Sequence, residues 1–69
     1  MTTNEILDRY FNLLPNHVRI AKSRDIRQSL NITRSVLSDW RRGRTRLEPE
    51  TLGEISEIVG VDLSEDVAV

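Results

Sequence analysis

Arginine side chains gather in the middle of the chain. Four of them lie within six positions, in the stretch RRGRTR at residues 41–46, and Arg34 precedes the first of them by seven residues. A guanidinium group is always charged, and its planar set of N–H donors matches the paired acceptors of a guanine edge or the oxygens of a phosphate. Such a cluster is suited to binding a polyanion. The alternative is a solvated surface on which these arginines pair with acidic groups of the same chain.

The formal net charge of -1 conceals a strong segregation of charge along the sequence. Residues 17–46 contain nine Lys and Arg against two Asp, whereas residues 47–69 contain seven Asp and Glu and no Lys or Arg. A basic middle segment followed by an acidic one indicates a polyanion-binding face on a domain that is nearly neutral as a whole.

The composition argues against several other kinds of chemistry. The sequence has 69 residues and no cysteine, which predicts one small domain over residues 1–69 and excludes disulfides and thiolate zinc sites. His17 is the sole histidine, and Glu54 and Glu57 lie on an expected exposed helix face with no sign of a pocket. No nucleophile motif or glycine-rich phosphate loop occurs. We therefore expect no enzyme, no metal and no cofactor.

Membrane and secretion signals are also missing from the sequence. No apolar run is long enough to span a bilayer, and Met1 is followed by polar residues rather than by the apolar segment of a signal peptide. We expect a protein of the bacterial cytoplasm.

A first helix is predicted near the N-terminus, where five apolar residues recur at helical spacing. They are Ile6, Leu7, Tyr10, Phe11 and Leu14. Thr2 and Glu5 stand three positions apart just before them, which is typical of a capping box. Pro15 and Asn16 are expected to end this helix. Residues 17–22 show no clear period, so a loop is expected there.

A short second helix and a sharp turn are expected next. Ser23 can cap a helix over residues 24–30, in which Ile26 and Leu30 are the apolar residues. Asn31 follows directly, and asparagine tolerates the left-handed backbone that turns a chain out of a helix. The chain is therefore expected to turn at Asn31.

The stretch RSVLSDWRR at residues 34–42 predicts a strongly amphipathic third helix, with Thr33 as its N-cap and Gly43 as its C-cap. At 3.6 residues per turn one face is apolar and the remainder is polar. The apolar face carries Val36, Leu37 and Trp40. That position favours a place in the core for Trp40 over a role as a base-stacking platform.

A fourth helix is expected to begin at Glu48 and Pro49 and to end at Gly60. Its inner stripe consists of Leu52, Ile55, Ile58 and Val59. The last residues, 62–69, could form one more short turn. With no strand-like alternation, the expected fold class is all-α, a compact bundle of four to five short helices.

The segment from Ser23 to Trp40 resembles the helix-turn-helix of the phage Cro and repressor DNA-binding domains. The shared features are apolar Ile26 and Leu30, the turn at Asn31, Ile32 after it, and Leu37 and Trp40 on the next helix. The stretches GRTR and LGEISEIVGVDL are similar to the loop and fourth helix of the same family, so the resemblance covers residues 23–63. It implies a lambda-repressor-like fold, with the helix-turn-helix at about residues 23–42. Arg27 departs from the small residue usual at its position, and Asn31 replaces the usual glycine.

The third helix is the expected reader of DNA bases. Arg34 lies in its first turn, the end that normally enters the major groove, and is the leading candidate for guanine contact. The resemblance implies that Ser35 and Asp39 also contact bases, and Ser38 shares their face. Asp39 can equally pair with Arg42 three residues further on.

Backbone phosphates are the expected partners of a second set of residues. This set consists of Ser23, Arg24, Thr33, Arg41, Arg42, Arg44 and Arg46. Flexible cationic arms displace counterions from DNA, and helix N-termini add hydrogen bonds to phosphates. Simple capping is the alternative for Ser23 and Thr33, and offsetting the helix dipole is the alternative for Arg41 and Arg42.

The expected function is that of a small Cro-like regulator, most simply a repressor that occludes a promoter. A reader this small needs two copies on a palindromic operator for useful specificity, so a homodimer is expected. The candidate dimer contacts are Val61, Leu63, Val67 and Val69, although Leu63 and Val67 could instead close the core. The acidic last third could also contact RNA polymerase. The competing class is a protein-interaction module on the same fold, such as an antirepressor or an antitoxin.

Overall fold

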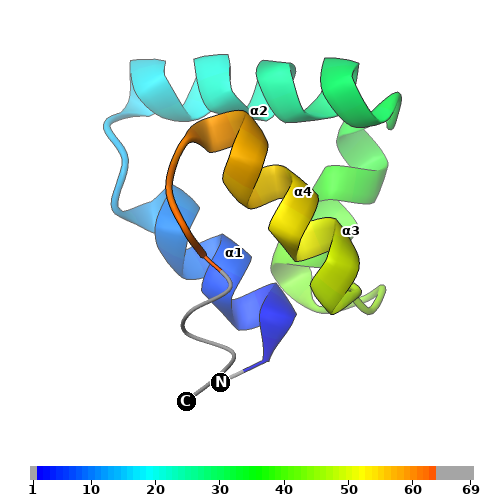
Figure 1. Cartoon of the computed structure of the whole chain (residues 1–69). Helices are drawn as coiled ribbons and strands as arrows, with labels where there is room; N and C mark the ends of the chain where they lie inside the picture. The colour runs from blue at the N-terminus through cyan, green and yellow to red at the C-terminus, as the bar shows by residue number, and fades with distance from the viewer. Residues whose placement is uncertain (1, 64–69) are drawn as a thin grey trace.

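The computed structural model describes residues 2–63, which fold into four α-helices and contain no strand. The helices are α1 (Thr3–Asn12), α2 (Asn16–Leu30), α3 (Arg34–Arg42) and α4 (Pro49–Val59). In Figure 1, α2 lies across the top of the molecule, with α1 below it at the left, α3 at the right and α4 in front. Helix α1 contacts α3, and α2 contacts α4. The predicted fold class, an all-α small bundle, is confirmed.

Every helix contributes to one hydrophobic core. Its buried members are Ile6, Leu7, Phe11, Ile26, Leu37, Leu47, Leu52, Ile55, Val59 and Leu63. Trp40 is partly buried and packs against this core, as its position on α3 predicts. Tyr10 also packs there, and burial raises the pKa of its phenol above the usual 10.0 because the charged form loses hydration.

The predicted start of α1 and both predicted ends of α3 are confirmed. At the start of α1, the Glu5 amide donates to Thr2 Oγ1 at 3.2 Å, and the Thr2 amide donates to Glu5 Oε1 at 3.4 Å. Thr33 Oγ1 accepts from the Val36 amide at 3.3 Å. The chain turns out of α2 through Asn31, at φ 55°, and out of α3 through Gly43, at φ 77°. These local bonds and turns set where α3 begins and ends.

The predicted loop over residues 17–22 is wrong, because α2 already begins at Asn16 and continues without a break to Leu30. Helix α1 correspondingly ends at Asn12, earlier than expected. Pro15 is the N-cap of α2, and its carbonyl accepts the Arg19 amide at 2.9 Å. A proline at a helix start has no N–H to leave unsatisfied, so it begins a helix as readily as it ends one.

Arg19 links the first turns of α2, which the sequence does not predict, to the end of α1. Its Nε donates to the Phe11 carbonyl at 3.1 Å, and its guanidinium also donates to the Leu14 carbonyl at 3.1 Å. Carbonyls near a helix C-terminus lack partners within the helix, and a cation also suits that negative end. The Arg19 side chain therefore closes the connection between the two helices.

Candidate nucleic-acid interface

Helix α3 is anchored on one side and open on the other. Leu37 is 3% exposed, and Trp40 packs beside it against the core. The four residues predicted to contact bases lie on the remaining surface of the same helix. Arg34 and Ser35 are exposed, whereas Ser38 and Asp39 are partly buried. The structure thus brings all four together on α3, with the apolar face behind them.

The ion pair considered for Asp39 and Arg42 is not formed within residues 2–63, where Arg41 pairs with Asp8 and Arg46 lies near Glu48. The backbone carbonyl of Asp39 instead accepts from the amides of Gly43 and Arg44, the latter at 2.9 Å. Arg42 is exposed at the end of α3. The turn after α3 is therefore built on the Asp39 main chain, and no ion pair ties the Arg42 side chain to a described residue.

The arginine loop, residues 43–48, is held in place by two residues of the first turn of α1. Asn4 Nδ2 donates to the carbonyls of Trp40 at 2.8 Å and Thr45 at 2.7 Å, and Asn4 Oδ1 accepts from the Leu47 amide at 3.3 Å. Thr3 Oγ1 donates to the Leu47 carbonyl. Because a single amide side chain bonds three backbone groups, the loop has a defined path rather than a free one.

Arg44 and Arg46 are exposed on this loop. Arg46 approaches Glu48 at 4.0 Å, but both side chains are mostly exposed, and ion pairs of this kind contribute little free energy. The two guanidinium groups therefore remain available to an external anion. Sequence reasoning placed these cations correctly in a loop after α3 but missed Asn4 and Thr3, which lie about forty residues earlier in the chain.

Arg41 differs from the other arginines of this region, because it is bound within the chain. Its Nε donates to Asp8 Oδ1 at 3.0 Å, and its guanidinium donates to Asn12 Oδ1 at 3.3 Å. The guanidinium also lies 5.0 Å from the centre of the Phe11 ring. The Arg41 side chain is 26% exposed. It ties the C-terminal end of α3 to α1, a link that the sequence analysis did not predict.

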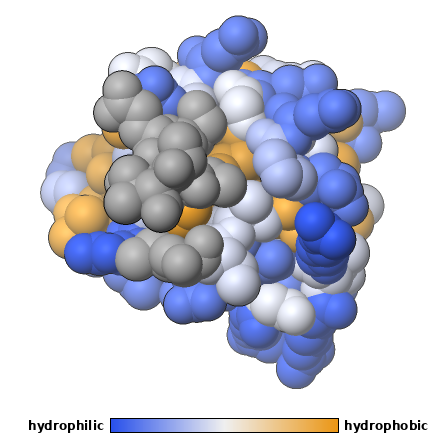
Figure 2. All heavy atoms as spheres, turned by 60° about the horizontal axis from the view of Figure 1, so that its bottom comes forward, coloured by the Kyte–Doolittle hydropathy of each residue, from blue (hydrophilic) through white to orange (hydrophobic). Residues whose placement is uncertain are grey.

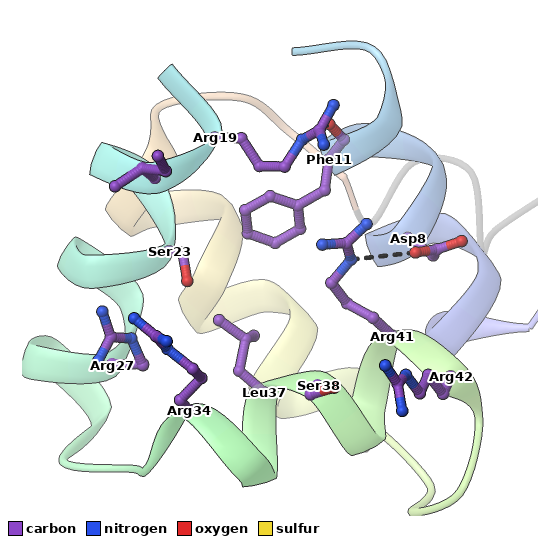
Figure 3. Close-up of a pocket in the computed structure, with 11 residues that line it drawn as sticks. Asp8, Phe11, Arg19, Ser23, Arg27, Arg34, Leu37, Ser38, Arg41 and Arg42 are labelled. Atoms are coloured by element: carbon purple, nitrogen blue, oxygen red, sulfur yellow. Dashed lines mark hydrogen bonds and ion pairs between the residues drawn. The ribbon is translucent and has the colours of Figure 1, made fainter. Parts of the chain in front are cut away.

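A hollow of about 580 Å³ opens where α1, α2 and α3 meet. Five arginines line it: Arg19, Arg27, Arg34, Arg41 and Arg42. The other lining residues are Asp8, Phe11, Ile20, Ser23, Leu37 and Ser38. In Figure 3, Arg41 points to Asp8 at one end of the hollow, whereas Arg27 and Arg34 extend from α2 and α3 at the other end. Most of the arginines of the basic middle segment thus face a common surface.

The expectation that Ser23 and Arg24 lie at a helix N-terminus is wrong, because α2 begins seven residues before Ser23. Ser23 caps nothing and lines the hollow, and Arg24 is exposed on the middle of α2. Thr33 does cap α3, as described above. Ser23 and Arg24 therefore have no helix dipole to add to a phosphate contact.

The four residues predicted to form a dimer contact have different positions. Leu63 is 5% exposed and packs in the core of its own chain, and its amide donates to the Oγ of buried Ser56 at 3.0 Å. Val61 is 46% exposed. Val67 and Val69, together with most of the predicted final turn, lie outside the described residues. Within residues 2–63, Val61 is thus the exposed member of the set.

The described residues on the face at the bottom of Figure 1 are mainly hydrophilic. Figure 2 shows this face, where blue side chains dominate and hydrophobic surface occurs in patches between them.

Residues 2–63 contain no group of three or more acidic or histidine side chains placed to hold a metal ion. In the same part of the chain, none of the helices has the length and apolar character needed to cross a bilayer.

Comparison with known proteins identifies the family. A helix-turn-helix family model matches residues 23–65, which is more than half of the chain and includes the second half of α2 and all of α3 and α4. No curated protein and no solved structure matches the chain. The matched segment begins at Ser23 and carries the turn at Asn31 and the anchored helix α3. The chain therefore belongs to the helix-turn-helix family of DNA-binding regulatory domains.

Proposed function

We propose that this protein binds double-stranded DNA sequence-specifically as a small Cro/repressor-like transcriptional regulator, with α3 in the major groove. The observation that carries the proposal is the two-sided character of α3. Leu37 and Trp40 anchor its back to the core, while its other face presents Arg34 and three further polar side chains. The major groove is about 12 Å wide and admits one helix, which must be held from behind in this way.

Arg34 is the principal base reader in this proposal. It is exposed in the first turn of α3, and a guanidinium can donate two hydrogen bonds to the N7 and O6 acceptors of guanine. Ser35 and Ser38 accept from or donate to either kind of base, and Asp39 accepts from the amino group of cytosine. The absence of an ion pair between Asp39 and Arg42 in residues 2–63 leaves both side chains free for DNA.

Phosphate contacts position α3 in the groove. Arg44 and Arg46 are the strongest candidates, because they are exposed on a loop that Asn4 holds against α1. Arg42 is exposed at the end of α3, and Arg24 is exposed on α2. Thr33, Ser23 and Arg41 remain in the proposed set, although each also has a place inside the chain. The contribution of Arg41 is expected to be the smallest, since its charge is balanced by Asp8.

The acting unit is proposed to be a dimer on a palindromic operator, and promoter occlusion is the proposed mode of repression. One copy of α3 spans few base pairs, and two copies related by a two-fold axis would read half-sites about 34 to 36 Å apart. Exposed Val61 and the chain end beyond it are the proposed contact. Leu63 would act only by supporting Val61, because Leu63 is in the core.

Duplex binding measured across a range of salt concentrations tests the proposal. Each phosphate contact should contribute a slope of about -0.9 to log affinity against log salt, so several contacts predict a steep fall. Selection of bound sites from a random duplex pool should then return a two-fold symmetric sequence. No duplex binding at low salt would overturn the proposal and favour a protein-interaction module on the same fold.

A further inference from the structure

The hollow between α1, α2 and α3 carries more positive charge than its own acidic groups can balance. Five arginines line it, and Asp8 is the one carboxylate among the lining residues. Asp8 is already bonded to Arg41 at 3.0 Å. The like charges of the remaining guanidinium groups repel one another in a concave site, where the surrounding protein reduces screening by water. The lining is therefore suited to an anion from outside the chain.

Two of the five arginines are occupied by the protein itself. Arg19 donates to the carbonyls of Phe11 and Leu14, and Arg41 donates to Asp8 and Asn12. These two side chains build the walls of the hollow. Their bonds leave the charge at the opposite end, around Arg27, unbalanced.

Arg27 is the most informative of the remaining arginines. Its Nε is buried and has no hydrogen-bond partner within residues 2–63, and the side chain forms no ion pair there. A buried N–H donor without a partner is costly, and the Arg27 side chain as a whole is only partly buried, so its guanidinium is expected to find an acceptor from outside the chain. Arg34 reaches the same hollow from α3, also without an ion pair to a described residue. The two side chains form a pair of donors on facing helices (Figure 3).

We propose that this end of the hollow binds a phosphate group between Arg27 and Arg34. Guanidinium groups donate paired hydrogen bonds to phosphate oxygens, and a doubly charged anion relieves the repulsion between two cations. Ser23 and Ser38 line the same hollow and add hydroxyl donors. The volume of about 580 Å³ has room for a diphosphate with water around it. This assignment explains why Arg27, whose Nε has no partner within residues 2–63, faces the hollow.

The phosphate can come from either of two sources with the same chemistry. One is a phosphate of the DNA backbone, which Arg27 would hold together with Arg34, so that the Arg34 guanidinium would contact this phosphate as well as a base. The other is a small free polyphosphate, which would occupy Arg34 and so compete with base reading. The choice between the two sources rests on the proposed DNA-binding function, whereas binding of a phosphate group at Arg27 does not.

Titration of the full chain with inorganic pyrophosphate, without DNA, tests the site itself. The arginine Nε–Hε signals in NMR spectra give a direct readout at constant ionic strength. Saturable binding with the largest shift at Arg27 is expected, and Arg27→Gln should weaken the binding at least tenfold. Lys22→Gln removes one positive charge from the same helix outside the hollow and should change the affinity less than twofold.

The titration can overturn the proposal in three ways. The first is a lack of saturable binding to the wild-type chain, the second is an equal loss of affinity in Lys22→Gln and Arg27→Gln, and the third is an Arg27 signal that does not shift. Circular dichroism of both variants shows whether the helices are retained. The Arg27 signal of the wild-type chain decides the matter even if Arg27→Gln fails to fold, because an unshifted signal at saturating pyrophosphate contradicts the site.

A second experiment with duplex DNA identifies the source of the phosphate. If the source is the DNA backbone, Arg27→Gln should flatten the salt slope by about 0.9, the value for one phosphate. If the source is a free polyphosphate, pyrophosphate should displace DNA from the wild-type chain but not from Arg27→Gln, with sodium chloride of equal ionic strength as the control. Failure of DNA binding alone would overturn the proposed function and leave the pyrophosphate titration valid.

Discussion

Arg34 and Arg41 lie seven residues apart on α3, close to the same side of the helix, yet their surroundings differ. Arg41 faces α1, where Asp8 and Asn12 accept its hydrogen bonds and Phe11 lies under its guanidinium. Arg34 is exposed and faces the hollow opposite Arg27. The difference shows that the opposing helix, rather than the residue type, decides which arginine holds the bundle together and which is free to bind a ligand.

Leu37 lies between these two arginines in the sequence and packs in the core, so its truncation should have the largest effect. Leu37→Ala is expected to lower the free energy of unfolding by about 2 to 5 kcal/mol, because it removes a side chain that is 3% exposed and leaves a cavity. Urea unfolding followed by circular dichroism measures the change. Glu54→Ala on the exposed side of α4 should change stability by less than about 0.5 kcal/mol. Equal effects of the two variants would contradict the anchoring of α3.

The proposed base contact of Arg34 is tested on DNA. Arg34→Ala should remove about 1 to 3 kcal/mol of discrimination between the selected site and a site with an altered base, since it deletes a base contact. Arg44→Ala should weaken binding to all duplexes alike and reduce the salt slope, because it deletes a phosphate contact. Fluorescence anisotropy with matched duplexes measures both. Identical behaviour of the two variants would show that Arg34 does not read bases.

The role of Arg41 in joining α3 to α1 is tested by measuring the stability of the fold. Arg41→Ala should destabilise the fold by about 1 kcal/mol, an effect reduced by solvent because the Arg41 and Asp8 side chains are 26% and 39% exposed. Arg34→Ala should leave stability nearly unchanged. A double-mutant cycle with Asp8→Ala isolates the pair, and a coupling of a few tenths of a kcal/mol or more is expected. Zero coupling would mean that Arg41 is not the link between α1 and α3.

The features of the fold that the sequence predicts correctly depend on interactions between residues that are close in the sequence. The capping box at Thr2, the turn at Asn31 and the caps of α3 at Thr33 and Gly43 each depend on bonds or backbone angles within a few residues. The residues that determine each of these features are neighbours in the sequence, so the features can be recognised from the sequence alone. The apolar spacing that places Trp40 against the core is equally local.

The first turns of α2 escaped prediction because the sequence there is weakly amphipathic. Val18 and Arg19 are partly buried, whereas Ile20 is 59% exposed, so the apolar residues do not form one stripe. The sequence predicts that Pro15 ends α1, but Pro15 is the N-cap of α2. A helix of this kind is held by tertiary contacts, here the bonds from Arg19 to the end of α1, rather than by its own period.

The positions of the candidate residues on α3 and in the loop after it were predictable from the sequence, but the partners that some of them have within the chain were not. The arginine cluster and the polar face of α3 follow from the sequence alone. The partners of Arg41 and of the arginine loop do not, because Asp8 lies 33 residues before Arg41 and Asn4 lies 43 residues before Leu47. Pairings at that separation depend on how the helices pack, which no local pattern specifies.

The contact surface of a selected duplex, mapped by amide NMR signals of the full chain at low salt, tests the central claim most directly. We predict that the signals of Arg34, Ser35 and Ser38 on α3 shift or broaden, together with that of Arg44 in the loop. Signals of Glu54 and Glu57 on the acidic face of α4 should stay unchanged. Perturbations centred on α4, or a bound duplex that leaves α3 unperturbed, would contradict the account.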